Sequence, residues 1–132
     1  MKQIIILVPE GQNNLSSIVG AYKILKRANA YWKEHRNIEL FDIKLAGISK
    51  EVEFHEGLFS VKPQLHISEV AQAKLIIIPS LNHNYDQAIN SNAEITAWIE
   101  HQYCKGAEIA SICTGAFLLA SAGILNGKTC ST

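Results

Sequence analysis

Three short, uninterrupted apolar segments limit the folds open to this chain. They occupy residues 4–8, 75–78 and 109–113. Continuous apolar runs of this length are typical of strands covered by helices on both faces, as in a parallel sheet. The segments between them carry apolar residues at helical spacing, as in residues 15–32, with Asn13 or Asn14 as the cap. Strands that alternate with helices predict a doubly wound α/β fold.

Other segments extend this prediction. Residues 38–47 alternate more, which favours a strand nearer an edge, and residues 52–63 favour two antiparallel strands around a Glu56-Gly57 turn. A second helix is expected to open at Ser91 or Asn92, with Ile95, Trp98 and Ile99 facing inward. A third starts after residue 113 and is capped by Gly123. We expect a last, short strand at the end.

Composition narrows the function classes. The 132 residues suit one domain and carry 12 basic and 12 acidic side chains without a basic stripe, so the chain is a poor nucleic-acid binder by itself. Its 3 cysteines form no CxxC spacing, which favours reduced thiols, no structural metal and a cytoplasmic location. The opening apolar run is too short to span a membrane. One glycine in "GQNNLSS" gives no dinucleotide motif, so no cofactor is expected.

Cys113 lies where a buried strand passes into a helix. Ser111 and Gly115 flank it two residues away on either side. Small residues at this spacing are typical of a nucleophile elbow, a turn so sharp that bulky neighbours would clash. The helix start would stabilise a thiolate, and the N–H of Thr114 would face an oxyanion. The alternative is that Cys113 is a small buried hydrophobic residue.

The segment "ICTGAFLLASAGILNGKTCST" resembles the elbow of the ThiJ/PfpI (DJ-1/PfpI-like) superfamily, whose fold is similar to class I glutamine amidotransferases. It is most similar to the branch that forms the N-terminal domain of AraC-type transcriptional regulators. The resemblance implies a flavodoxin-like three-layer sandwich with a mainly parallel sheet, often dimeric. It also implies a domain that senses a small molecule and precedes a helix-turn-helix domain that binds DNA.

Several positions depart from the enzymatic relatives. Ser17 stands where they carry a carboxylate on the first helix, and Pro79-Ser80-Leu81 replaces the Pro-Gly-Gly loop that supplies a second oxyanion donor. The histidine of the family would follow Thr132 directly. We therefore expect residues 1–132 to be a single, C-terminally truncated ThiJ/PfpI-like domain that lacks its C-terminal part and the helix-turn-helix. Glu10, at the end of the first strand, is an alternative carboxylate.

The predicted function is ligand sensing in an AraC-type regulator, with a small-molecule effector bound beside Cys113. The predicted ligand-binding residues come from three strand ends and the first helix: Cys113, Thr114, Gly115, Ser80, Leu81, His83, Glu10 and Ser17. The alternative is a Cys113-dependent hydrolase, isonitrile hydratase or glyoxalase-like enzyme, and a third possibility is a thiol that senses oxidation. His83 is either a ligand contact or a solvated loop residue. Packing accounts best for Cys104, Cys130 and Trp32.

Overall fold

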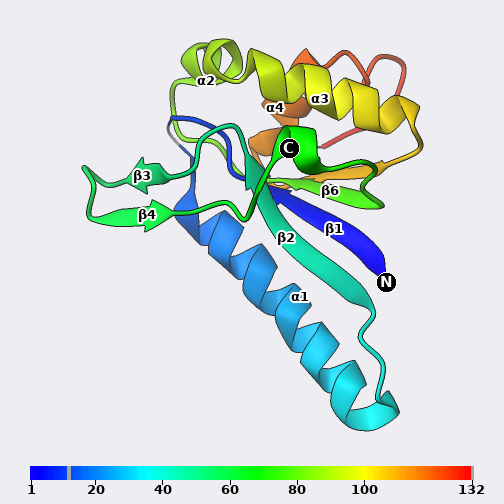
Figure 1. Ribbon diagram of the computed structural model, residues 1–132. Helices are drawn as coiled ribbons and strands as arrows, with labels where there is room; N and C mark the ends of the chain where they lie inside the picture. Colours follow the sequence, from blue (N-terminus) through cyan, green and yellow to red (C-terminus); the bar gives the residue numbers. More distant parts are fainter. Residues whose placement is uncertain (12, 132) are drawn as a thin grey trace.

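The computed structural model describes residues 1–11 and 13–131 and shows a parallel sheet between two helical layers (Figure 1). Gln12 and Thr132 lie outside the described residues. Thr132 is the residue at which the domain was predicted to end. The sheet has the strand order β5-β2-β1-β6-β7. These strands are β1 (Lys2–Leu7), β2 (Phe41–Gly47), β5 (Leu65–His66), β6 (Leu75–Ile78) and β7 (Glu108–Ser111).

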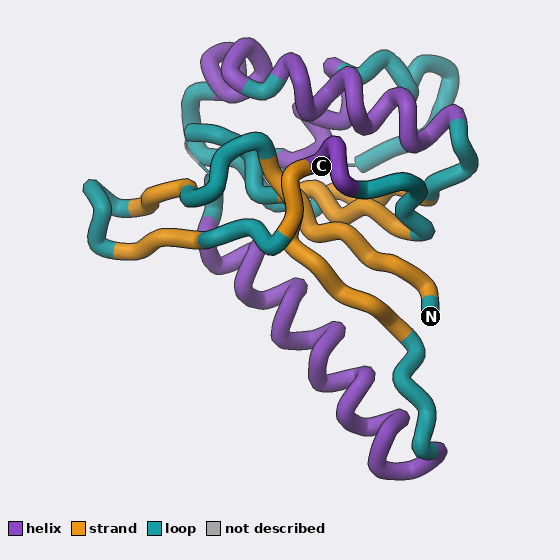
Figure 2. Tube along the Cα trace, viewed as in Figure 1, coloured by secondary structure: helices purple, strands orange, loops and turns teal. Residues whose placement is uncertain are grey.

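The helices divide between the two faces of the sheet. Helix α1 (Leu15–Arg36) covers one face, whereas α2 (Tyr85–Ser91), α3 (Ala93–Cys104) and α4 (Gly115–Ser121) cover the other. A 3-10 turn, η1 (Ile67–Glu69), follows β5. In Figure 2 the distal half of α1 extends beyond the sheet. No described helix has both the length and the apolar character that crossing a membrane requires.

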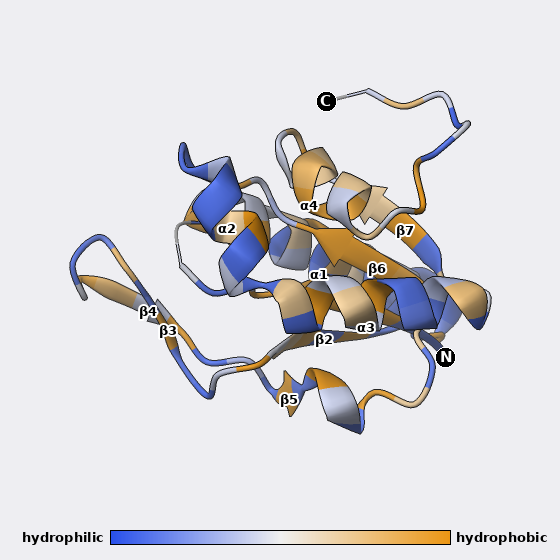
Figure 3. Cartoon of the chain, turned by 90° about the horizontal axis from the view of Figure 1, so that it is seen from above, coloured by the Kyte–Doolittle hydropathy of each residue, from blue (hydrophilic) through white to orange (hydrophobic). Residues whose placement is uncertain are grey.

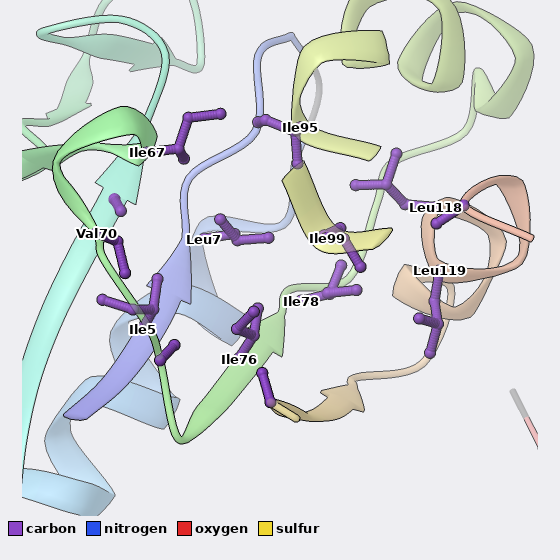
Figure 4. Packing of buried hydrophobic residues seen from close by; sticks show 14 of the residues in the cluster. Ile5, Leu7, Ile67, Val70, Ile76, Ile78, Ile95, Ile99, Leu118 and Leu119 are labelled. Carbon is purple, nitrogen blue, oxygen red and sulfur yellow. The ribbon is translucent and has the colours of Figure 1, made fainter. Parts of the chain in front are cut away.

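Strand β1 explains why the apolar runs are continuous. Ile5 and Leu7 belong to the core under α3 and α4, whereas Ile4 and Ile6 belong to the core under α1. Successive side chains of a strand point to opposite faces, so a strand with helices on both sides needs apolar residues at every position. Figure 4 shows the first core, in which Ile76, Ile78, Ile95 and Leu118 converge from separate elements.

An antiparallel hairpin stands apart from the sheet. Strands β3 (Val52–Phe54) and β4 (Phe59–Val61) pair with each other and extend away from the body of the molecule (Figure 2). The N–H of Leu58 donates to the carbonyl of His55 at 3.1 Å. Glu56 and Gly57 between them have φ values of 58° and 82°, as in a type I′ turn. The predicted Glu56-Gly57 turn is confirmed.

The helix starts follow the predicted caps. The Asn14 side chain accepts from the N–H of Ser16 at the start of α1, and Asn92 occupies the position before α3. Gly123, with a φ of 80°, follows α4 as predicted. In Figure 3 the central strands are hydrophobic and α2 is largely hydrophilic, whereas α3 carries both hydrophobic and hydrophilic residues. This pattern matches helices that present one face to solvent.

Several sequence predictions were wrong. Helix α2 was not predicted; Asn84 caps its start by accepting from the N–H of Gln87. The final strand does not form in residues 129–131, which have no regular structure. Trp32 is 37% exposed because α1 runs past the sheet at that point, leaving Trp32 to contact the Arg36 guanidinium. Cys104 and Cys130 are exposed rather than packed.

Candidate functional site

The elbow at Cys113 has the strained backbone that its sequence context predicted. Cys113 has a φ of 49°, in the left-handed region that non-glycine residues rarely adopt. The N–H of Ile112 still donates to the carbonyl of Ile78 at 2.9 Å, and the N–H of Gly115 turns back to Ile112 at the same distance. The chain therefore leaves the sheet and begins α4 within a few residues. Cys113 is exposed at this turn, so it is not the buried hydrophobic residue of the alternative interpretation.

Gly115 makes the sharp turn possible. A Cβ atom at this position would lie 2.5 Å from the carbonyl oxygen of Pro79 and 2.9 Å from that of Ile78. Both obstructing atoms belong to the backbone at the end of β6, so they cannot rotate away. Gly115 is needed here for close approach rather than for its dihedral freedom. Its role is structural, and it supports the position of Cys113.

Thr114 fixes the neighbouring loop. Its hydroxyl donates to the carbonyl of Leu81 at 2.8 Å and accepts from the N–H of Leu81 at 2.9 Å. Ser80 Oγ lies 2.9 Å from Thr114 Oγ1. Because the single hydroxyl hydrogen of Thr114 points to Leu81, the Ser80 hydroxyl is the donor in that contact. The Thr114 hydroxyl therefore has one donor and two acceptor positions filled, and it locks the loop onto the elbow.

Ser17 is also used to hold this loop. The N–H of Ser80 donates to Ser17 Oγ at 3.0 Å, and Ser17 Oγ donates to the carbonyl of Asn14 at 2.7 Å. The N–H of Asn14 in turn donates to the carbonyl of Ser80 at 2.8 Å. The N–H groups of Ser80 and Leu81 are thus both engaged within the protein. Neither is free to act as the second oxyanion donor that a cysteine nucleophile would use.

Glu10 is placed against α2 rather than joined to the thiol. Its N–H donates to Asn92 Oδ1 at 2.7 Å, and its carbonyl accepts from Asn92 Nδ2 at 3.1 Å. Its side chain lines a small cavity of about 70 Å³ with Asn84 and Gln87 of the α2 region. Within the described chain, Glu10 makes no hydrogen bond to Cys113. Glu10 is therefore not positioned as a replacement for the carboxylate of the family.

A larger cavity lies beside the elbow loop. It measures about 540 Å³, is open to solvent, and is lined by the loop after β1, the loop after β6 and the β3–β4 hairpin. His83 and Asn82 line it, as does Asn13, whose carbonyl accepts from Asn82 Nδ2 at 3.1 Å. Cys113 is not among its lining residues. The predicted site thus divides into a thiol with its locked loop and an adjoining cavity that contains His83.

Sequence reasoning missed the contribution of the hairpin. Glu53, Phe54, His55 and Glu56 line the same cavity as His83. The turn signal at Glu56-Gly57 predicted the hairpin itself, but no local pattern says which loops it would approach. That placement depends on Val52 and Phe54, which pack into the core beneath α1. The structure therefore adds an acidic wall that the sequence alone did not place.

Comparison with known proteins identifies the family. The family model described as the DJ-1/PfpI family matches residues 2–132, and the chain belongs to this family. The predicted membership is confirmed. A search of curated proteins found no match.

Solved structures confirm the predicted flavodoxin-like α/β fold. The chain is similar to a proposed transcriptional regulator from Vibrio parahaemolyticus, with 24% identity and a TM-score of 0.77 over 94% of this chain and 62% of that one. An AraC family regulator from Pseudomonas putida gives 15% identity and a TM-score of 0.67, covering 97% of this chain and 64% of that one. A DJ-1 mutant from Schizosaccharomyces pombe gives 15% identity and a TM-score of 0.65, covering 94% of this chain and 64% of that one. This chain thus spans less than two thirds of the length of these proteins.

Proposed function

We propose that this domain binds a small-molecule effector at the carboxyl edge of its sheet, as the sensing part of an AraC-type transcriptional regulator. The observation that carries the proposal is that the N–H groups of the loop after β6 are already hydrogen-bonded within the protein. The N–H groups of Ser80 and Leu81 are occupied by Ser17 and Thr114, so the loop is built to be held in place rather than to stabilise an oxyanion. The fold similarity to regulators from two organisms also supports a sensing function.

Effector binding would act by shifting an equilibrium. A ligand changes the population of two states only if it binds one of them more tightly. The loop after β6 joins three regions, because Ser80, Leu81 and Asn82 bond to α1, the elbow and the loop after β1. A ligand against Asn82 and His83 would therefore bias a network that reaches the start of α1. We propose a dimer interface or a DNA-binding domain as the element that this network controls.

A thermal-shift screen tests the sensing function. Amino acids, amines, sugars and organic acids are added to the chain, and we expect at least one to raise the melting temperature, since a ligand that binds the native state stabilises it. His83→Ala should reduce the shift. His101→Ala, which removes an exposed histidine from α3, is the matched control and should leave it unchanged. A shift that survives in His83→Ala would contradict a site in this cavity.

The exposed, strained thiol favours one second candidate, a Cys113-dependent enzyme. Methylglyoxal and an alkyl isonitrile are suitable substrates for the test, with Cys113→Ala as the inactive comparison. We expect no turnover above that of Cys113→Ala. Turnover by the wild-type chain that disappears in Cys113→Ala would establish the enzyme and overturn a purely sensory role.

A further inference from the structure

The outer edge of β2 is left open along its first half. Strand β5 pairs only with Ala46 and Gly47, and no other described strand lies on that side of β2, where α1 runs alongside (Figure 1). An edge strand of this kind presents backbone N–H and C=O groups that no neighbouring strand uses. These groups are then available to side chains, water or ligands.

Alternate residues of β2 direct their backbone groups to this open edge. The N–H of Val8 donates to the carbonyl of Ala46, so Ala46 and the other even-numbered residues of β2 face β1. In a parallel strand both backbone groups of one residue point to one side, and those of the next residue point to the other. Phe41, Ile43 and Leu45 therefore direct their N–H and C=O groups to the open edge.

Side-chain carboxamides bind two of these three positions. At Phe41, the N–H donates to Asn29 Oδ1 at 3.0 Å, and the carbonyl accepts from Asn29 Nδ2 at 2.7 Å. At Leu45, the N–H donates to Gln64 Oε1 at 2.8 Å, and the carbonyl accepts from the backbone N–H of Gln64 at 3.0 Å. A primary carboxamide carries a donor and an acceptor side by side, so it matches the N–H and C=O of one strand residue.

Ile43, midway between them, offers the same pair of groups without a hydrogen-bond partner among the described residues. An open cavity of about 390 Å³ lies at this position and is lined by Asn29 and Gln64 as well as Ile43. Asp42 and Lys44 also line it, and their side chains point to the opposite face of the sheet from that of Ile43. A cavity lined by residues of both faces lies over the edge of the strand, where the backbone groups of Ile43 point.

We propose that the edge of β2 at Ile43 binds a small molecule that carries a primary carboxamide. The ligand donates an N–H to the Ile43 carbonyl and accepts from the Ile43 N–H, as the Asn29 side chain does at Phe41. An extended peptide fits less well, because it would pair with every second residue and the groups of Phe41 and Leu45 are already used. The site shares no lining residue with the cavity beside the elbow loop, so it goes beyond the proposed function.

Heteronuclear NMR spectroscopy of the 132-residue chain can test the geometry of the ligand. Benzamide is the probe, because its primary carboxamide has an N–H on the same side as its oxygen. N-methylbenzamide keeps a donor and an acceptor but directs them to opposite sides, since secondary amides are trans, and benzoate has acceptors only. We expect benzamide to shift the amide signal of Ile43. The other two probes should bind at least about fivefold more weakly, since each can form only one of the two hydrogen bonds.

Variants locate the site. Ile43→Pro removes the N–H that faces the open edge but no hydrogen bond of the sheet, and proline is tolerated at edge positions of this kind. We expect this variant to lose benzamide binding. Ile43→Val keeps both backbone groups and should leave the dissociation constant unchanged. Circular dichroism checks that both variants fold, and the probe series on the wild-type chain decides the proposal if Ile43→Pro does not fold.

Each other outcome overturns the proposal. Equal binding of benzoate would show that acceptors alone suffice, and equal binding of N-methylbenzamide would remove the need for a donor and an acceptor side by side. Benzamide binding that survives in Ile43→Pro, or that shifts other amides but not Ile43, would place the ligand elsewhere. The absence of any shift would end the ligand class. The thermal-shift screen with His83→Ala decides the proposed function separately.

Discussion

The elbow and the β3–β4 turn both hold non-glycine residues in the left-handed region. The elbow is hydrogen-bonded to a neighbouring loop, whereas the turn is exposed to solvent. Cys113 has a φ of 49° and is followed by Thr114, whose hydroxyl is saturated by Ser80 and Leu81. His55 and Glu56 have φ values of 53° and 58° in an exposed turn. Unfavourable dihedrals persist where packing over-determines them, as at the elbow, or where a tight turn requires them, as in the hairpin.

This difference has a functional meaning. Relaxation of the elbow would break its hydrogen bonds to β6 and to the loop after β6, so the elbow is expected to stay rigid when a ligand binds. Among the described residues the two hairpin strands pair only with each other, and Val52, Phe54 and Val61 pack against the core beneath α1. The part of the 540 Å³ cavity lining that the hairpin supplies is therefore the part that we expect to adjust to a ligand. The predictions below test this contrast.

Gly115→Ala should have the largest effect. The added Cβ would meet the backbone carbonyl oxygens of Ile78 and Pro79, and we expect a loss of about 3 kcal/mol in the free energy of unfolding because the core there cannot expand. Urea denaturation measures this. Gly20→Ala is the matched control in α1, where nothing lies within 4 Å of an added Cβ, so it should stabilise by about 0.5–1 kcal/mol. If Gly115→Ala and Gly20→Ala changed the free energy of unfolding equally, Gly115 would not be needed for the close approach of α4 to the end of β6.

Thr114→Val should have the next largest effect. The substitution keeps the shape of the side chain but leaves the N–H of Leu81 without its acceptor, at a cost of about 2 kcal/mol. The comparison is Thr96→Val, which removes one exposed bond to the carbonyl of Ala93 and should cost much less. Hydrogen exchange should also speed up at Leu81 in Thr114→Val. An unchanged exchange rate would show that the elbow does not hold the loop.

Glu56→Asn should have the smallest effect and the opposite sign. Asn-Gly is favoured in type I′ turns, so the hairpin should gain about 0.5 kcal/mol. Thermal melts of the variant measure this gain, with Glu51→Asn as the control outside the turn. A melting temperature that stays the same or falls in Glu56→Asn would argue against the type I′ turn at Glu56-Gly57.

The sequence by itself determined the architecture and the position of the elbow. Continuous apolar runs such as residues 4–8 are typical of a sheet with helices on both sides, and Ser111 and Gly115 around Cys113 predicted the sharp turn. These inferences succeed because periodicity and local backbone sterics act over a few residues. The sequence failed at Trp32, where inward spacing predicted burial, because local spacing does not reveal that α1 outruns the sheet.

Only the tertiary structure decided how the predicted site is divided. It joined Ser17 to Ser80 and Thr114 to Leu81, turned Glu10 towards α2, and placed the acidic hairpin opposite His83. These residues lie far apart along the chain, and their approach depends on how helices and loops pack on the sheet. Hydrogen bonds and cavities between such segments depend on that packing, which no local pattern of residues encodes.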